Sequence, residues 1–150
     1  MNSDYASKET DRRSVSGGLV MCAGACVSFF SKTQASVALS STEAEYAAMA
    51  EGLKESIFLR YVWSFLLPGR DVGCTVVKED NIGALHLANN PATTPNSKHI
   101  DIRHHFIRER VERGEFRIVH VPSGLQHADF LTKPLHLGPF CTHRKFAMNL

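Results

Sequence analysis

Residues 40–46 read Ser40-Ser41-Thr42-Glu43-Ala44-Glu45-Tyr46, and they open the most regular helical pattern in the chain. Thr42 with Glu45 three residues later is a capping-box pattern, so we predict that the helix begins at Thr42. The Leu-Pro-Gly sequence of residues 67–69 ends it. Apolar residues recur between these limits at steps of three and four, which predicts one apolar face along about six turns: Tyr46, Met49, Ala50, Leu53, Ile57, Tyr61 and Phe65.

Shorter elements surround this helix. Before it, residues 19–22 and 26–31 read as the two strands of a hairpin, and residues 1–16 have room for one further strand. After it, alternating and helical patterns predict strands at 74–77 and 116–121 and helices at 82–89, 100–113 and 126–133. Strands that precede and separate the helices in this way predict a single α/β domain with a mixed sheet.

The composition excludes several classes of protein. The 150 residues suit one domain, and 17 Lys and Arg against 15 Asp and Glu give a net charge of +2, unlike an arginine-rich nucleic-acid binder. Because there is no long apolar run and no leader-like start, we expect neither a membrane span nor a signal peptide. The four cysteines are irregularly spaced, so we expect reduced thiols in an intracellular protein.

Three acidic residues lie where an α/β protein places an active site. Glu45 lies in the first turn of the long helix, Asp80 follows an apolar strand, and Asp129 lies in the short helix after the last strand. Carboxylates that converge from separate elements repel one another unless a cation neutralises them. Oxygen ligands favour Mg²⁺ or Mn²⁺, and two such ions about 4 Å apart suit phosphodiester hydrolysis.

Each acid also has a purely structural interpretation. Glu45 can be the second half of the capping box, Asp80 the N-cap of the next helix, and Asp129 a first-turn acid favoured by the helix dipole. Spacing alone leaves these alternatives open.

Four sequence blocks resemble the ribonuclease H domain of copia-type long-terminal-repeat retrotransposons. They are LSSTEAEY at residues 39–46, the pair Asp80-Asn81, KHIDIRHHFIRE at residues 98–109 and ADFLTKPL at residues 128–135. The resemblance implies a ribonuclease H-like fold, with a five-stranded mixed sheet flanked by helices. It covers residues 1–137, with the first strand truncated at the N-terminus, and leaves residues 138–150 as a C-terminal tail.

The resemblance also implies a function. Carried over position by position, Glu45, Asp80 and Asp129 are catalytic and metal-binding residues for two Mg²⁺ or Mn²⁺ ions, whereas Glu43 is solvent-exposed or capping. The implied reaction is cleavage of the RNA strand of an RNA/DNA hybrid during reverse transcription. The implied partner is the reverse transcriptase domain of the same Pol polyprotein, without a membrane, and the implied location is cytoplasmic, including virus-like particles.

The first strand departs from the family pattern. The first metal-binding Asp of the family aligns with Asn2, and Asp4 aligns with a more variable second acid that we count among the candidate catalytic residues. Asn2 offers a neutral oxygen to the metals, so the site has one negative charge fewer. A fragment of a longer reading frame, an inactivating substitution and a decayed copy all fit. The alternative function is therefore a catalytically impaired remnant that binds nucleic acid weakly or serves a structural role.

Substrate binding requires contacts with phosphates and 2′-hydroxyl groups. The candidates are Ser41, Asn81, Lys98, His99, Arg103 and Arg108. The structural alternative is that Ser41 and Asn81 cap helices and that the charges of the helix at 100–113 pair with its own acids.

Overall fold

The computed structural model describes residues 1–90 and 98–150, with the backbone alone for residues 98–101. The elements in chain order are β1 (Asn2–Asp4), β2 (Val15–Cys22), β3 (Ala25–Thr33), α1 (Ser41–Leu66), β4 (Thr75–Glu79), α2 (Ile82–Asn89), α3 (Lys98–Glu112), β5 (Phe116–His120), the short 3₁₀ helices η1 (Ser123–Leu125) and η2 (Asp129–Leu131), and α4 (Leu137–Met148). The α/β class is therefore confirmed.

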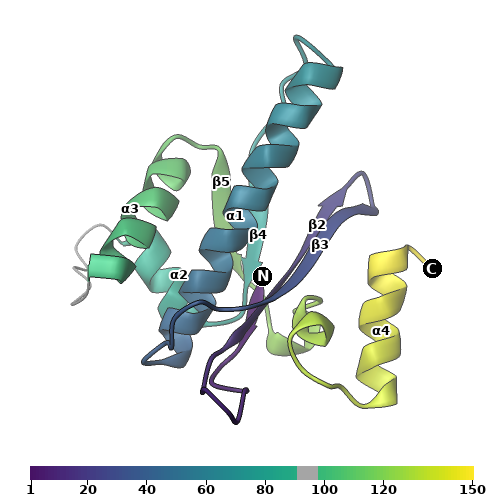
Figure 1. Ribbon diagram of the computed structural model, residues 1–150. Helices are drawn as coiled ribbons and strands as arrows, with labels where there is room; N and C mark the ends of the chain where they lie inside the picture. Colours follow the sequence, from purple (N-terminus) through teal and green to yellow (C-terminus); the bar gives the residue numbers. More distant parts are fainter. Residues whose placement is uncertain (91–97) are drawn as a thin grey trace.

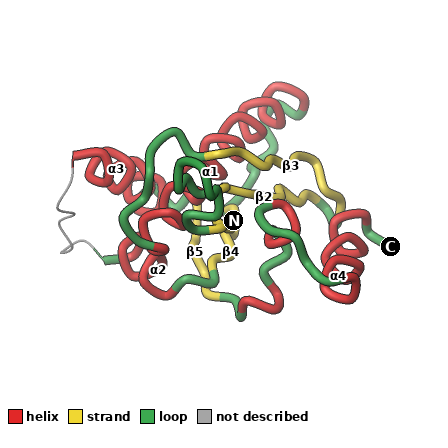
Figure 2. Tube along the Cα trace, turned by 60° about the horizontal axis from the view of Figure 1, so that its bottom comes forward, coloured by secondary structure: helices red, strands yellow, loops and turns green. Residues whose placement is uncertain are grey.

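The strands form two sheets rather than the expected sheet of five. β1, β2 and β3 are antiparallel neighbours in that order, while β4 and β5 form a parallel pair. The two sheets meet beside the N-terminus, where the Met1 amino group donates a hydrogen bond to Lys78 O at 2.9 Å (Figure 2). Because β1 is three residues long, this contact does not extend into a ladder.

The core lies between α1 and the strands. Small residues on the first half of α1, such as Ala44 and Ala48, allow close packing against β1 and β2, and α2 and α3 cover the β4–β5 pair (Figure 1). The buried side chains that join these layers include Tyr46, Met49, Leu53, Val77, Ile107, Phe116 and Ile118. The first turn of α1 lies beside the start of α2, where Thr42 Oγ1 donates to Asn81 Oδ1 at 3.4 Å, and α2 begins just after the end of β4.

The second half of α1 extends beyond the ends of the strands. Figure 1 shows it rising beyond the strands, and there the apolar face predicted from the sequence is open to solvent. Tyr61 is exposed, and Phe65 is 84% exposed. The periodicity identified the helix correctly, but the strands are too short to cover its whole length.

The C-terminal residues contribute a further element. We expected a tail at residues 138–150, but Leu137–Met148 form α4, which lies against β3 and η2. His143 on α4 is buried, and the ring of Phe140 meets that of Phe130 edge to face at 6.0 Å.

Across the described residues, no helix has the length and hydropathy needed to cross a bilayer. All four cysteines are free thiols, as expected.

Candidate metal centre

The N-terminus of α1 is capped two residues earlier than we predicted. Ser40 is the N-cap, and its hydroxyl accepts a hydrogen bond from Glu43 N at 3.1 Å. The Glu43 carboxylate in turn accepts from Leu39 N at 2.7 Å. The prediction of Thr42 and Glu45 as the capping pair is therefore wrong, and Glu43 does the capping. Glu45 has no part in the cap and is available for another role.

The start of α2 likewise excludes Asp80 as a cap. Asn81 is the N-cap, and its side-chain oxygen accepts from Ala84 N at 2.9 Å. Asp80 lies between the end of β4 and this cap, and its Oδ1 is buried without a hydrogen-bond partner. The structural interpretations of Glu45 and Asp80 are thus both removed.

The structure brings Glu45 and Asp80 together with a third acid, Glu79. One oxygen atom from each of the three carboxylates lies within 4.8 Å of the other two. The sequence prediction missed Glu79 because it ended the strand at residue 77. Extending the alternation by two residues places Val77 and Glu79 on the same inward face of β4 and would have found it.

Glu45 and Glu79 are buried, Asp80 is half-buried, and all three are incompletely paired. Glu45 is 8% exposed and Glu79 is 0% exposed. Glu45 Oε2 and Glu79 Oε2 have no hydrogen-bond partner, and neither has the buried Asp129 Oδ1. Unpaired buried acceptors are costly, and a divalent cation would satisfy them. Because Mg²⁺ holds oxygens at about 2.1 Å, its ligand oxygens lie at most about 4.2 Å apart, which these side chains reach with a small inward movement.

Asp129 lies beside this group but is not within it. Its Oδ2 forms an ion pair with Lys133 Nζ at 2.8 Å, one turn further along the chain. Its charge nevertheless acts on the Met1 amino group, as do the charges of Glu45, Glu79 and Asp80. Asp129 on η2 thus acts on the same amino group as the three clustered acids, and its predicted metal-binding role remains a prediction.

The two candidates on β1 are placed differently. Asn2 is 2% exposed, and its amide nitrogen donates to Thr132 Oγ1 at 2.8 Å. Thr132 Oγ1 also donates to Asp129 O at 3.0 Å, so Asn2 is linked to the segment that carries Asp129. Asp4 is half-buried, pairs in register with Val15 and is not one of the three clustered acids.

Burial dominates the electrostatics of the cluster. Burial, followed by the charge of Glu79, raises the pKa of Glu45 to about 9, against a hydrogen bond from the Ser3 backbone that lowers it. Burial also raises the pKa of Glu79 to about 7, although the hydrogen bond from Asn81 N opposes the shift. The pKa of the Met1 amino group is lowered by burial, and the four acids oppose this change. Without a cation, the cluster thus takes up protons.

These shifts predict opposite pH trends without and with metal. The folded-state pKa values of Glu45 and Glu79 are raised, so the metal-free protein should lose stability as pH rises from about 4.5 through about 7 and about 9. The lowered pKa of the Met1 amino group has the opposite effect, because it increases stability as pH rises toward 8.0. This is one group against the two carboxylates, so the net trend should remain a loss of stability. Bound Mg²⁺ favours the ionised carboxylates and should reverse the trend.

Thermal melting at about pH 5.5 and about pH 8.5, with chelator or with Mg²⁺, measures this difference. A melting temperature that rises with pH in chelator would contradict the prediction. So would a melting temperature that Mg²⁺ leaves unchanged at both pH values.

The predicted nucleic-acid contacts are spread over the start of α1, α2 and α3. Ser41 is exposed in the first turn of α1, and Asn81 caps α2 as the structural alternative proposed. Arg103 is half-buried beside Lys32, where both line a cavity of about 80 Å³. Arg108 forms an ion pair with Glu112 at 2.8 Å. Lys98 and His99 lie outside the residues whose side chains the structure describes.

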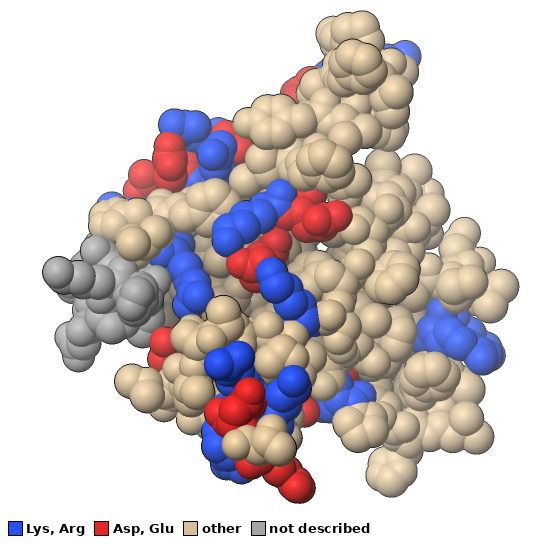
Figure 3. All heavy atoms as spheres, viewed as in Figure 1, with Lys and Arg blue, Asp and Glu red and all other residues tan. Residues whose placement is uncertain are grey.

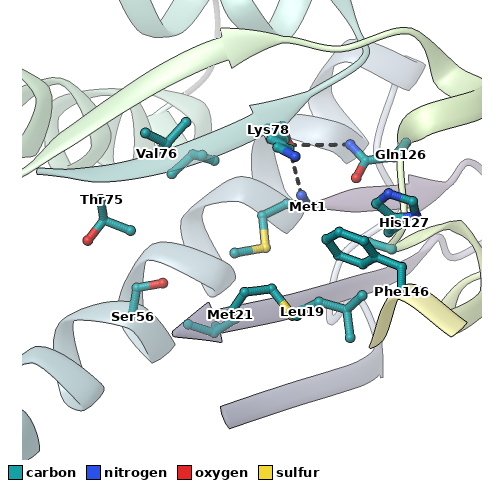
Figure 4. Close-up of a pocket in the computed structure, with 13 residues that line it drawn as sticks. Met1, Leu19, Met21, Ser56, Thr75, Val76, Lys78, Gln126, His127 and Phe146 are labelled. Atoms are coloured by element: carbon teal, nitrogen blue, oxygen red, sulfur yellow. Dashed lines mark hydrogen bonds between the residues drawn. The ribbon is translucent and has the colours of Figure 1, made fainter. Parts of the chain in front are cut away.

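A separate cavity of about 180 Å³ lies between β2 and β4 (Figure 4). Met1 points into it from one side, His127 and Phe146 close another, and the ring of Phe146 stacks on His127 at a centroid distance of 3.7 Å. Leu19, Met21 and Val76 make much of its wall apolar. This lining suits neither a phosphate backbone nor a hard cation.

Comparisons with known proteins give a consistent relationship. The chain is 40% identical over 141 residues to "Retrovirus-related Pol polyprotein from transposon RE1" of Arabidopsis thaliana, covering 93% of this chain and 9% of the relative. It is 37% identical over 140 residues to "Retrovirus-related Pol polyprotein from transposon TNT 1-94" of Nicotiana tabacum, covering 93% of this chain and 10% of the relative. A third relative, "Secreted RxLR effector protein 161" of Plasmopara viticola, is 48% identical over 58 residues, which are 39% of this chain and 41% of that protein.

The chain therefore spans about a tenth of the length of the Pol polyproteins that it matches. No family model matches the chain, and no solved structure matches it. The relationship to transposon Pol polyproteins thus rests on sequence identity along nearly the whole chain.

Proposed function

We propose that this chain is the ribonuclease H domain of a retrotransposon Pol polyprotein and is built to cut the RNA strand of an RNA/DNA hybrid with two Mg²⁺ or Mn²⁺ ions. The observation that carries the proposal is the group of Glu45, Glu79 and Asp80 at the end of β4. One oxygen of each acid lies within 4.8 Å of the other two, and each acid has a buried oxygen without a hydrogen-bond partner. The proposal is supported by the match to a transposon Pol polyprotein, which is 40% identical and covers 93% of this chain.

The strand arrangement is compatible with this proposal. In the proposed ribonuclease H-like fold the strands would run in the order β3-β2-β1-β4-β5, with β1 central. The antiparallel set of three, the parallel pair and the hydrogen bond from Met1 N to Lys78 O all agree with that order. The acids then lie at the carboxyl end of β4, where open α/β sheets bind their ligands.

The side chains have distinct parts in the proposed reaction. Bound divalent ions would lower the pKa of an attacking water and stabilise the leaving 3′-oxygen. Glu45 on α1 and Asp80, which directly follows β4, would hold the ions, and Glu45 would also orient water or a sugar hydroxyl. Asp129 approaches from η2, and its pairing with Lys133 fixes its orientation.

Hybrid binding would rely on a few local contacts rather than on a broad basic surface. On the face drawn in Figure 3, Lys and Arg side chains are interspersed with Asp and Glu over α1 and α3. Arg103 lines a cavity with Lys32 and Glu51, which form an ion pair, and is the best described candidate for a phosphate contact. The exposed Ser41 hydroxyl is available to a 2′-hydroxyl. We also propose the reverse transcriptase domain of the same polyprotein as a partner, because the matched relatives are whole Pol polyproteins.

One observation favours a second candidate function. Asn2 is buried where the resemblance expects an ionised ligand, and its amide nitrogen is committed to Thr132. A domain with this substitution would bind hybrid and metal but cleave RNA slowly. The two functions share the fold and the cation and differ in the cleavage rate.

The double substitution Arg103→Ala/Arg108→Ala tests the substrate class. Hybrid affinity should fall, and the log–log salt slope should shrink by about 1 for each phosphate that the variant no longer neutralises. Most of the loss should come from Arg103, because Arg108 is already paired with Glu112. Fluorescence anisotropy with labelled RNA/DNA hybrid and with DNA duplex, at several salt concentrations, measures both effects.

Arg144→Ala/Lys145→Ala is the matched control, since it removes two positive charges from exposed positions on α4. If both double variants weaken binding equally, net charge explains the effect and the proposed face is wrong. Equal affinity of the unmodified protein for hybrid and DNA duplex would contradict the proposed substrate.

A further inference from the structure

We propose that Glu79 is itself a ligand of the divalent cation and supplies the negative charge that Asn2 does not. This inference rests on the proposed function, because it concerns the same metal centre. It concerns the binding of one cation by this chain's own acids and makes no claim about cleavage.

Glu79 has a buried oxygen without a partner and lies beside the other two acids. The side chain is fully buried at the end of β4. Its Oε1 accepts a hydrogen bond from Asn81 N at 3.0 Å, whereas Oε2 has no partner. One oxygen of Glu79 lies within 4.8 Å of oxygens from Glu45 and Asp80. Three acids therefore lie close together, one on α1, one at the end of β4 and one directly after β4.

The protein provides little positive charge of its own at this point. Within the described part of the chain, no Lys or Arg side chain forms an ion pair with Glu45, Glu79 or Asp80. Lys78 is exposed, with its ammonium over the ring of Phe146, and Lys133 is paired with Asp129. The α-amino group of Met1 is a positive group that acts on both Glu79 and Glu45.

A structural role does not explain why this residue is an acid. The hydrogen bond from Asn81 N requires an acceptor, and a glutamine oxygen would provide one without adding charge. An additional carboxylate at a fully buried position beside two others is costly unless a cation pairs with it. With Asn2 neutral, Glu79 brings the number of acids around the cation back to that expected with an aspartate at position 2.

Glu79→Gln separates these roles, because it keeps the acceptor and removes the charge. The readout is Mn²⁺ binding, measured by the electron paramagnetic resonance signal of free Mn²⁺ and by calorimetry, so no cleavage is needed. Glu79→Gln should lower Mn²⁺ affinity by about tenfold to a hundredfold, and adding Asn2→Asp to it should restore much of the loss. Glu55→Gln on α1 is the matched control, since it makes the same charge change where Glu55 accepts from Ser28, and it should bind Mn²⁺ like the unmodified protein.

Glu79→Asp provides a second variant and keeps the charge on a shorter side chain. Its Mn²⁺ affinity should lie between those of the unmodified protein and Glu79→Gln. If circular dichroism shows that Glu79→Gln does not fold, the inference is tested by comparing Glu79→Asp with the unmodified protein. Equal Mn²⁺ affinity of these two proteins would overturn the inference.

The outcomes distinguish this inference from the proposed function. Unchanged affinity in Glu79→Gln, with binding abolished in Asp80→Asn, would overturn the role of Glu79 and leave the metal centre standing. Binding that appears only after Asn2→Asp would do the same. Affinity that survives both Glu79→Gln and Asp80→Asn, or Mn²⁺ binding absent even in Asn2→Asp, would overturn the metal centre and with it the proposed function.

Discussion

Asn2→Asp is expected to raise Mg²⁺-dependent cleavage of the RNA strand of a hybrid by about a thousandfold. An amide at position 2 removes one unit of negative charge from a site that must hold two divalent ions. Glu45, Glu79 and Asp80 can hold one ion between them, but a second ion needs a ligand on the side of β1 and η2. A carboxylate at position 2, beside the segment that carries Asp129, would provide it.

The surroundings of Asn2 can accept this change. Its amide nitrogen donates to Thr132 Oγ1, and the Thr132 hydroxyl at present donates to Asp129 O. Rotation of that hydroxyl would let it donate to the new carboxylate instead, so a hydrogen bond is kept without repacking. The substitution is isosteric, and we expect no large change in thermal stability when Mg²⁺ is present.

Cleavage of an end-labelled hybrid, followed on a denaturing gel with Mg²⁺ or Mn²⁺, measures the gain. Asn89→Asp, at the exposed end of α2, adds the same charge away from the site and should leave the rate unchanged. If Asn2→Asp is inactive with both ions, the non-cleaving function is correct. If the unmodified chain already cleaves well and Asp4→Asn abolishes it, Asp4 is the true ligand and the alignment of the first strand is off by two residues.

The sequence predicted best those elements that local patterns determine. The helix at residues 82–89 has the predicted bounds, because Asn81 caps its start and Asn90 caps its end. The strand at 116–121 begins with an alternation of apolar and polar residues and ends within one residue of the prediction. The convergence of Glu45 and Asp80 on one edge was also predicted, since the resemblance fixed their order and the strand end fixed the edge.

The remaining features depend on contacts that the sequence does not display. The capping box had two overlapping candidates, and the backbone took Ser40 with Glu43. In the sequence, position 79 has the pattern of a polar loop. In the structure, it belongs to β4, because the pairing with β5 continues as far as Glu79 and His120. α4 contains Gly138 and Pro139 in its first turn and shows little periodicity, so its packing on β3 and η2 was not foreseeable.

Glu45→Gln, made in the Asn2→Asp background, should abolish cleavage while making the metal-free protein more stable at about pH 8. Burial raises the pKa of Glu45 to about 9, so at this pH the unfolded chain carries an ionised carboxylate that must bind a proton on folding. Each pKa unit corresponds to about 1.4 kcal/mol, and a neutral, isosteric glutamine should therefore add on the order of a few kcal/mol to the free energy of unfolding in chelator. Denaturant unfolding at that pH measures the gain.

The same substitution removes the negative charge of a ligand carboxylate. Mg²⁺-dependent cleavage should therefore fall by about a hundredfold or more, to the background of the assay, and stabilisation by Mg²⁺ should weaken. Glu51→Gln on the same helix is the matched control with the opposite sign. The pKa of Glu51 is lowered by its hydrogen bond and ion pair with Lys54, so neutralising it should cost a little stability and spare cleavage. A Glu45→Gln protein that is less stable in chelator yet still cleaves would mean that this carboxylate supports the fold rather than the metal. Increased stability combined with abolished activity is the result expected where a fold holds several acids together for a cation to bind.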